Sequence, residues 1–198
     1  PVRDLSLATD GGPIAVAWSQ AVAGIHQVYL RANTGSGWVE LDQSASGRGV
    51  SDSDGASIAS TLAYHDHELY LAWQDDSTGR GEIYARRYDG VAWTAAGFRA
   101  DQGGGVSNPD ASVEDRSATR PQLAAGGNTL HLTWIEHRVE RKEGAFTSIF
   151  ATRWGGAGFA AEIGGDARDL GISRLRGSAD DLALADNEFG HPFVAWSD

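Results

Sequence analysis

Four short apolar runs, each ending in tryptophan, organise the pattern of hydrophobic and polar positions along the chain. They end at Trp18, Trp73, Trp134 and Trp196, so successive tryptophans lie 55, 61 and 62 residues apart. Apolar residues fill nearly every position of each run, which is typical of a strand covered on both faces. The spacing therefore predicts an internal repeat with a buried strand at the centre of each unit.

Further strands are predicted on both sides of each tryptophan run. A short apolar piece and a polar turn precede the run, and a segment of alternating polar and apolar residues follows it, at 27–31, 82–86 and 148–152. Such alternation is typical of a strand that is partly exposed. A glycine turn then leads to a last strand that opens with Trp38, Trp93 or Phe159. Each unit therefore contains four strands.

Four short antiparallel strands repeated at a fixed period indicate an all-β fold, a β-propeller built of four-stranded blades. The blades are predicted at about 1–56, 57–117 and 118–178, with half of a fourth at 179–198, and together they form a single propeller segment. Propeller rings close with roughly four to eight blades. We therefore expect an open segment of a larger propeller, which needs further blades or a neighbouring chain to close the ring.

Composition and charge narrow the class of partner. The formal net charge is -11 and the chain lacks cysteine and methionine. An acidic chain is a poor partner for nucleic acid, which binds clustered cations. The lack of cysteine excludes disulfides and thiol chemistry, and no stretch reaches the roughly 20 apolar residues of a membrane span. We expect an extracellular or cell-surface bacterial protein.

The recurring segments resemble the repeat of secreted bacterial β-propeller proteins, in the broad sialidase-like and kelch-like group. The resemblance covers the whole chain and is carried by Val-Ala-Trp-x-Asp at 194–198, Ile-Tyr-x-Arg at 83–86, Gly-x-x-Trp at 90–93 and Gly-Gly-Val-Ser at 104–107. It implies the fold and leaves the activity open, because these residues are those that a blade needs for packing. The Asp-box of sialidases is absent, since residues 51–55 have neither its spacing nor its tryptophan.

Aromatic residues near the glycine turns are candidates for stacking on sugar rings. They are Trp38, Tyr88, Trp93 and Trp154. Packing between blades is the competing interpretation, because large aromatic rings are also the main component of protein cores.

Paired polar residues on the connections between units suggest a metal site. Asp52 and Asp54 occupy the same place in the first unit as Asn108 and Asp110 in the second. Hard oxygen ligands on a glycine-rich loop suit Ca²⁺, whereas Asx turns use the same residues without a metal. Ca²⁺ is therefore a possible cofactor, with these four residues as its candidate ligands.

A polar residue follows each tryptophan run at a fixed distance, and we expect it to be structural. The position is filled by Gln20, Asp75, Glu136 and Asp198. A catalytic group is needed once, whereas a hydrogen bond at the end of a strand is needed in every blade. The sequence thus assigns no catalytic residue.

The leading functional hypothesis is a non-enzymatic extracellular module that binds a glycan or protein partner through blade loops and acts as a scaffold. The first alternative is part of a sialidase-like glycoside hydrolase or lyase, which would need arginine and carboxylate side chains at the blade axis. Arg3 and Arg120 are candidates for that role, because they precede comparable strands. The second alternative is a structural repeat of a surface assembly or filament.

Overall fold

The computed structural model describes residues 1–108, 116–140, 144–159, 171–174 and 177–198, which form strands and turns and contain no helix. The strands are β1 (Val2–Thr9), β2 (Ile14–Val22), β3 (Ile25–Asn33), β4 (Trp38–Val39), β5 (Ser57–His65), β6 (Glu68–Asp75), β7 (Glu82–Tyr88), β8 (Trp93–Ala95), β9 (Arg116–Gly126), β10 (Thr129–Glu140), β11 (Gly144–Arg153), β12 (Asp180–Asp186) and β13 (Pro192–Ser197). No helix in the described part of the chain is long and apolar enough to cross a membrane.

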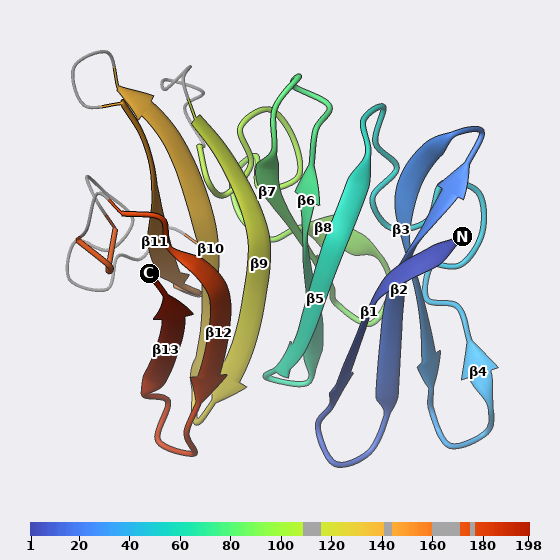
Figure 1. Cartoon of the computed structure of the whole chain (residues 1–198). Helices are drawn as coiled ribbons and strands as arrows, with labels where there is room; N and C mark the ends of the chain where they lie inside the picture. Colours follow the sequence, from blue (N-terminus) through green and yellow to red (C-terminus); the bar gives the residue numbers. More distant parts are fainter. Residues whose placement is uncertain (109–115, 141–143, 160–170, 175–176) are drawn as a thin grey trace.

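Four antiparallel sheets follow one another along the chain. Their strand orders are β1-β2-β3-β4, β5-β6-β7-β8, β9-β10-β11 and β12-β13, and we call them blades 1 to 4. Figure 1 shows the first strands of the blades, β1, β5, β9 and β12, side by side along the inner edge of an open array. The predicted all-β, open propeller is confirmed. Most of the predicted fourth strand of the third unit lies outside the described residues.

An insertion in the third unit, residues 138–145, carries charges of both signs, and the sequence predicts a longer hairpin turn there. In the structure β10 continues to Glu140 and β11 begins at Gly144, and these two residues are the last pair of the antiparallel ladder. Strand pairing continues because each added residue satisfies its backbone groups in the ladder.

The core lies between the blades, where a tryptophan face packs on a face of smaller residues. Trp73 and Leu71 of blade 2 are fully buried and cluster with Ala15 and Ala17 of blade 1. Trp134 of blade 3 clusters in the same way with blade 2. Removal of a buried aromatic side chain typically costs about 3–5 kcal/mol. These tryptophans are therefore the main contacts that hold successive blades together.

A Gly-Val-Ser or Gly-Ile-Ser segment completes the third strand in three blades. The segments are Gly49-Val50-Ser51, Gly105-Val106-Ser107 and Gly171-Ile172-Ser173. In blade 2 the Val106 amide donates to the Ile83 carbonyl oxygen at 2.8 Å, and the Ile83 amide donates to Oγ of Ser107 at 3.0 Å. The segment therefore satisfies backbone groups that the short fourth strand leaves free.

We predict that Gly105→Ala destabilises the protein by about 3 kcal/mol or more. Gly105 has a φ of +60°, and an added Cβ would overlap the Ile83 carbonyl group. Gly103 is the matched control, because its φ is +58° but an added Cβ would meet nothing within 4 Å. Urea unfolding should show a loss of about 1 kcal/mol for Gly103→Ala. Equal losses in the two variants would contradict the proposed close approach.

Candidate functional site

Each innermost strand contains a β-bulge at the same place. In blade 1 the pairing shifts after Arg3, so that Asp4 and Leu5 together lie opposite Trp18. The first bulge residue has a left-handed φ in every blade: Asp4 (54°), Ala59 (53°), Arg120 (53°) and Asp181 (49°). This conformation costs a residue with a side chain roughly 1–2 kcal/mol. Strain of this kind clusters at functional sites and is held by the surrounding structure.

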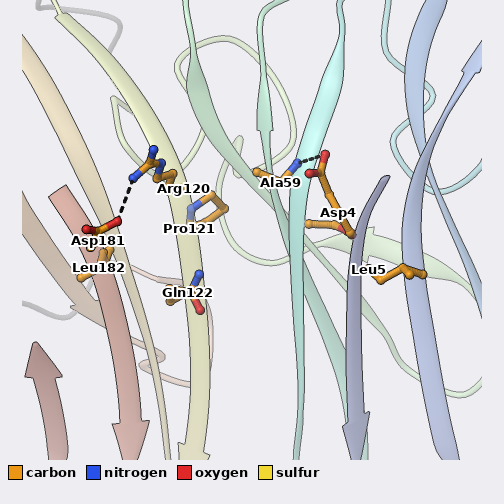
Figure 2. A pocket seen from close by; sticks show the side chains of 9 residues that line it. Asp4, Leu5, Ala59, Arg120, Pro121, Gln122, Asp181 and Leu182 are labelled. Carbon is orange, nitrogen blue, oxygen red and sulfur yellow. Dashed lines mark hydrogen bonds and ion pairs between the residues drawn. The ribbon is translucent and has the colours of Figure 1, made fainter. Parts of the chain in front are cut away.

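The four bulges line one pocket on the inner edge of the blades, with a volume of about 320 Å³. Its wall consists of Asp4, Leu5, Ala59, Ser60, Arg120, Pro121, Gln122, Asp181 and Leu182. Figure 2 shows these side chains on the four neighbouring inner strands. Bulges often redirect side chains beside active sites. A repeated irregularity of the strands therefore produces a single concave surface.

Two carboxylates and one guanidinium group line this pocket. The Ala59 amide donates a hydrogen bond of 3.1 Å to Oδ2 of Asp4. Nη1 of Arg120 contacts Oδ1 of Asp180. The same atom lies 3.9 Å from Oδ1 of Asp181, and Figure 2 marks this ion pair. The Asp181 side chain is 82% exposed, so a ligand in the pocket can reach it. Asp4 lies on β1 and Asp181 on β12, with Arg120 on β9 between them in blade order.

The arrangement has the groups that acid-base chemistry on a sugar requires. Paired carboxylates can donate a proton to a leaving oxygen and activate water or attack directly. A guanidinium group offers donors in a fixed plane to hydroxyl or carboxylate oxygens. The pocket therefore combines a possible reactive pair with a binding group.

The structure corrects the expected relation between Arg3 and Arg120. Strand register places Arg120 level with Asp4, and Arg3 level with Thr119. Nε of Arg3 donates to Nδ1 of His26 at 3.4 Å. Burial, followed by the positive charge of Arg3, lowers the pKa of His26. Arg3 thus belongs to the outer contacts of β1, and Arg120 is the arginine that lines the pocket.

The polar residues after the tryptophan runs are structural, as the sequence suggests. The indole Nε1 donates to the residue two places later in three blades, from Trp18 to Gln20 at 3.3 Å, from Trp73 to Asp75 at 3.3 Å and from Trp134 to Glu136 at 3.4 Å. Both carboxylates are buried. These bonds fix the tilt of each indole ring and satisfy its only polar group.

Arg116 joins two of the buried carboxylates. Its Nη1 donates to Oε2 of Glu136 at 2.6 Å, and its Nη2 donates to Oε2 of Glu82 at 3.2 Å. All three side chains are almost completely inaccessible to solvent. A substrate cannot reach this cluster, so it links blade 2 to blade 3 and is no candidate for catalysis.

The predicted stacking residues do not gather at the pocket. Trp93 donates from Nε1 to the Leu41 carbonyl oxygen at 2.8 Å and lies 5.5 Å from the Tyr88 ring. Trp154 packs against Tyr70 and Phe159, with ring centroids 5.1 and 5.4 Å away. These three residues pack mainly between blades, whereas Trp38 is half exposed on β4. A stacking role for the four remains a prediction.

The predicted Ca²⁺ ligands are spread over different environments. Arg48 contacts Asp52 at 3.3 Å and Asp54 at 2.9 Å. Asn108 is buried, and its backbone amide donates to the Gly104 carbonyl oxygen. Asp110 lies outside the described residues. Among the residues that the structure describes, no three His, Cys, Asp or Glu side chains lie close enough together to hold a metal ion.

Comparison with known proteins identifies the fold. No protein-family model matches the sequence, and no characterised protein matches it in sequence. A family 117 glycoside hydrolase from the marine bacterium Zobellia galactanivorans superposes with a TM-score of 0.54 at 10% identity, over 92% of this chain and 59% of that one. An endo-arabinase from Bacteroides thetaiotaomicron gives a TM-score of 0.51 at 13% identity, over 97% of this chain and 68% of that one.

These similarities correct the leading functional hypothesis. We expected a non-enzymatic binding and scaffold module, but the two solved structures described above, which share this fold, are glycoside hydrolases. The pocket agrees with this correction. Its wall includes Asp4, Arg120 and Asp181, and arginine and carboxylate side chains are those that the hydrolase alternative requires.

Sequence reasoning named Arg120 but missed the pocket, because the four bulge positions carry three different residue types, Asp, Ala and Arg. Bulge residues with a left-handed φ are commonly glycine, and none of these four is glycine. The signal that could have found them is the presence of Asp4, Arg120 and Asp181 directly before the apolar pieces that precede the tryptophan runs. Charged residues at such positions call for a functional or structural explanation.

We predict that Arg116→Ala destabilises the protein by about 1–3 kcal/mol, because it removes the cation shared by Glu82 and Glu136 and leaves each glutamate with one other arginine, Arg80 or Arg138. Arg31→Ala is the control, since Arg31 is exposed on β3. Chemical unfolding followed by tryptophan fluorescence measures both changes. Equal stability of the Arg116 and Arg31 variants would rule out a stabilising role for the ion pairs of Arg116.

Proposed function

We propose that the bulge pocket is the active site of a glycoside hydrolase, with Asp4 and Asp181 as its catalytic carboxylates. The observation that carries this proposal is the presence of both carboxylates on strained bulges at the inner edge of the blades, with Arg120 between them in blade order. The fold shared with two glycoside hydrolases supports it.

The proposed reaction is hydrolysis of a glycosidic bond. One carboxyl group protonates the leaving oxygen as its bond to the anomeric carbon breaks. The other carboxylate takes a proton from the attacking water, or forms a glycosyl ester that water then hydrolyses. Arg120 donates hydrogen bonds to substrate oxygens and holds the sugar between the two carboxylates.

The chain covers only part of the length of the similar hydrolases. The chain spans 59% of the family 117 hydrolase and 68% of the endo-arabinase. We propose that further blades supply the remainder of the pocket wall, and that the substrate is an extracellular polysaccharide. Arabinan is the first choice because one relative is named as an endo-arabinase.

We predict that the protein releases reducing sugar from a polysaccharide panel that includes arabinan, and that Asp4→Asn and Asp181→Asn each lower the rate by about 10²–10⁴-fold. Loss of a proton donor or base removes a transition-state interaction and leaves the fold intact. The assay is reducing-sugar release together with chromatography of the products.

The matched control is Asp66→Asn. Asp66 is also exposed and left-handed (φ 49°), but it lies in the turn between β5 and β6. It should keep the wild-type rate. A wild-type protein that is folded yet inactive on the whole panel, or a control that loses as much activity as the pocket variants, would refute the proposal.

A further inference from the structure

Arg120 is the one cation among the described residues that line the bulge pocket, and it already has a carboxylate partner. Its Nη1 contacts Oδ1 of Asp180, and the same atom lies 3.9 Å from Oδ1 of Asp181. Asp180 comes directly before the bulge of β12 and is not part of the pocket wall. The positive charge of Arg120 is therefore offset by protein carboxylates before any ligand binds.

Carboxylates outnumber cations at this pocket. Asp4 and Asp181 line it together with Arg120, and Asp180 lies beside Arg120. The proposed reaction needs one of the two lining carboxyl groups in its protonated form. The other carboxylate and Asp180 then still place two negative charges against one positive charge. Because the chain as a whole has a net charge of -11, an anionic ligand is repelled both by the pocket and by the surrounding protein.

The rest of the described wall is uncharged and suits a neutral sugar ring. It consists of Leu5, Ala59, Ser60, Pro121, Gln122 and Leu182. The aliphatic side chains offer an apolar surface to the C–H groups of a sugar, and the Gln122 amide offers donors and an acceptor to hydroxyl groups. The remaining N–H groups of Arg120 can donate to hydroxyl oxygens, which carry no charge for Asp180 to repel.

We propose that Asp180 makes the bulge pocket selective for neutral glycans, because it neutralises the guanidinium group that a sugar carboxylate would otherwise bind. A guanidinium group holds a carboxylate best through two parallel N–H donors. Asp180 occupies the donor at Nη1 and adds a negative charge beside the others. The inference rests on the proposed function, since it takes the pocket as the sugar site. It narrows the substrate to uncharged polysaccharides and excludes polymers of uronic or sialic acids.

The test compares the binding of two polymers that share a backbone and differ in charge, arabinan and carboxymethylated arabinan. Biolayer interferometry with the full chain immobilised gives a Kd for each polymer and does not require hydrolysis. The wild type should bind arabinan at least about fivefold more tightly than the carboxymethylated form. Added salt should narrow this difference, because it screens the repulsion between the polymer and the pocket.

Asp180→Asn tests the cause of the selectivity. The change removes the negative charge beside Arg120 and should strengthen binding of the carboxymethylated polymer about fivefold. The side chains of Arg120 and Asp180 are 53% and 57% exposed, so loss of their ion pair should leave the fold intact. Addition of Arg120→Gln should abolish the gain, because the freed guanidinium group supplies it. Asp66→Asn is the control, since it removes one exposed carboxylate outside the pocket and should give no gain.

Binding and hydrolysis separate this inference from the proposed function. A wild type that binds carboxymethylated arabinan as tightly as arabinan, or that binds neither polymer, would overturn the inference. An Asp180→Asn variant with no gain, or with no more gain than Asp66→Asn, would also overturn it. Selective binding of arabinan without release of reducing sugar would support the inference and contradict the hydrolase activity. Release of reducing sugar with no preference for the neutral polymer would contradict the inference alone.

Discussion

The packing of a tryptophan face on a face of small residues is the interaction on which the rest of the structure depends. Trp73 and Trp134 fill the spaces between successive blades, and each indole nitrogen bonds to a buried carboxylate two residues later. The bond fixes the ring, and the ring sets the approach of the next sheet. Small residues recur at one side of each junction, so each pair of neighbouring blades packs in the same way. The inner strands are thereby brought side by side.

That arrangement explains why the bulges form a site. A bulge in one strand would turn one side chain aside, but four bulges at the same level turn Asp4, Arg120 and Asp181 toward a common pocket. Left-handed aspartate, alanine and arginine residues are strained, and the ladders on both sides of each bulge hold them in place. The fold thus supplies a rigid frame, and the bulges place charged side chains at its inner edge.

The sequence predicts the frame better than the site. Residues equivalent to Trp73 and to the Gly105-Val106-Ser107 segment recur along the chain, because burial and turn geometry require similar residues in each blade. The strands and blades could therefore be predicted from the sequence. The bulge residues share a backbone conformation but carry three different side chains, so no residue type marks this position in every blade. The position of Trp93 and Trp154 near glycine turns suggested sugar stacking, but a sequence pattern does not show that the neighbouring blade covers them. The similarity of this propeller to two solved glycoside hydrolases became evident only from comparison of the structures.

The most direct measurement is a crystal structure of the protein with a bound arabinan oligosaccharide. The account predicts a sugar ring in the bulge pocket, with its glycosidic oxygen within hydrogen-bonding distance of Asp4 or Asp181 and a hydroxyl group bonded to Arg120. A sugar bound instead against Trp38 at the outer edge, with the bulge pocket empty, would contradict it.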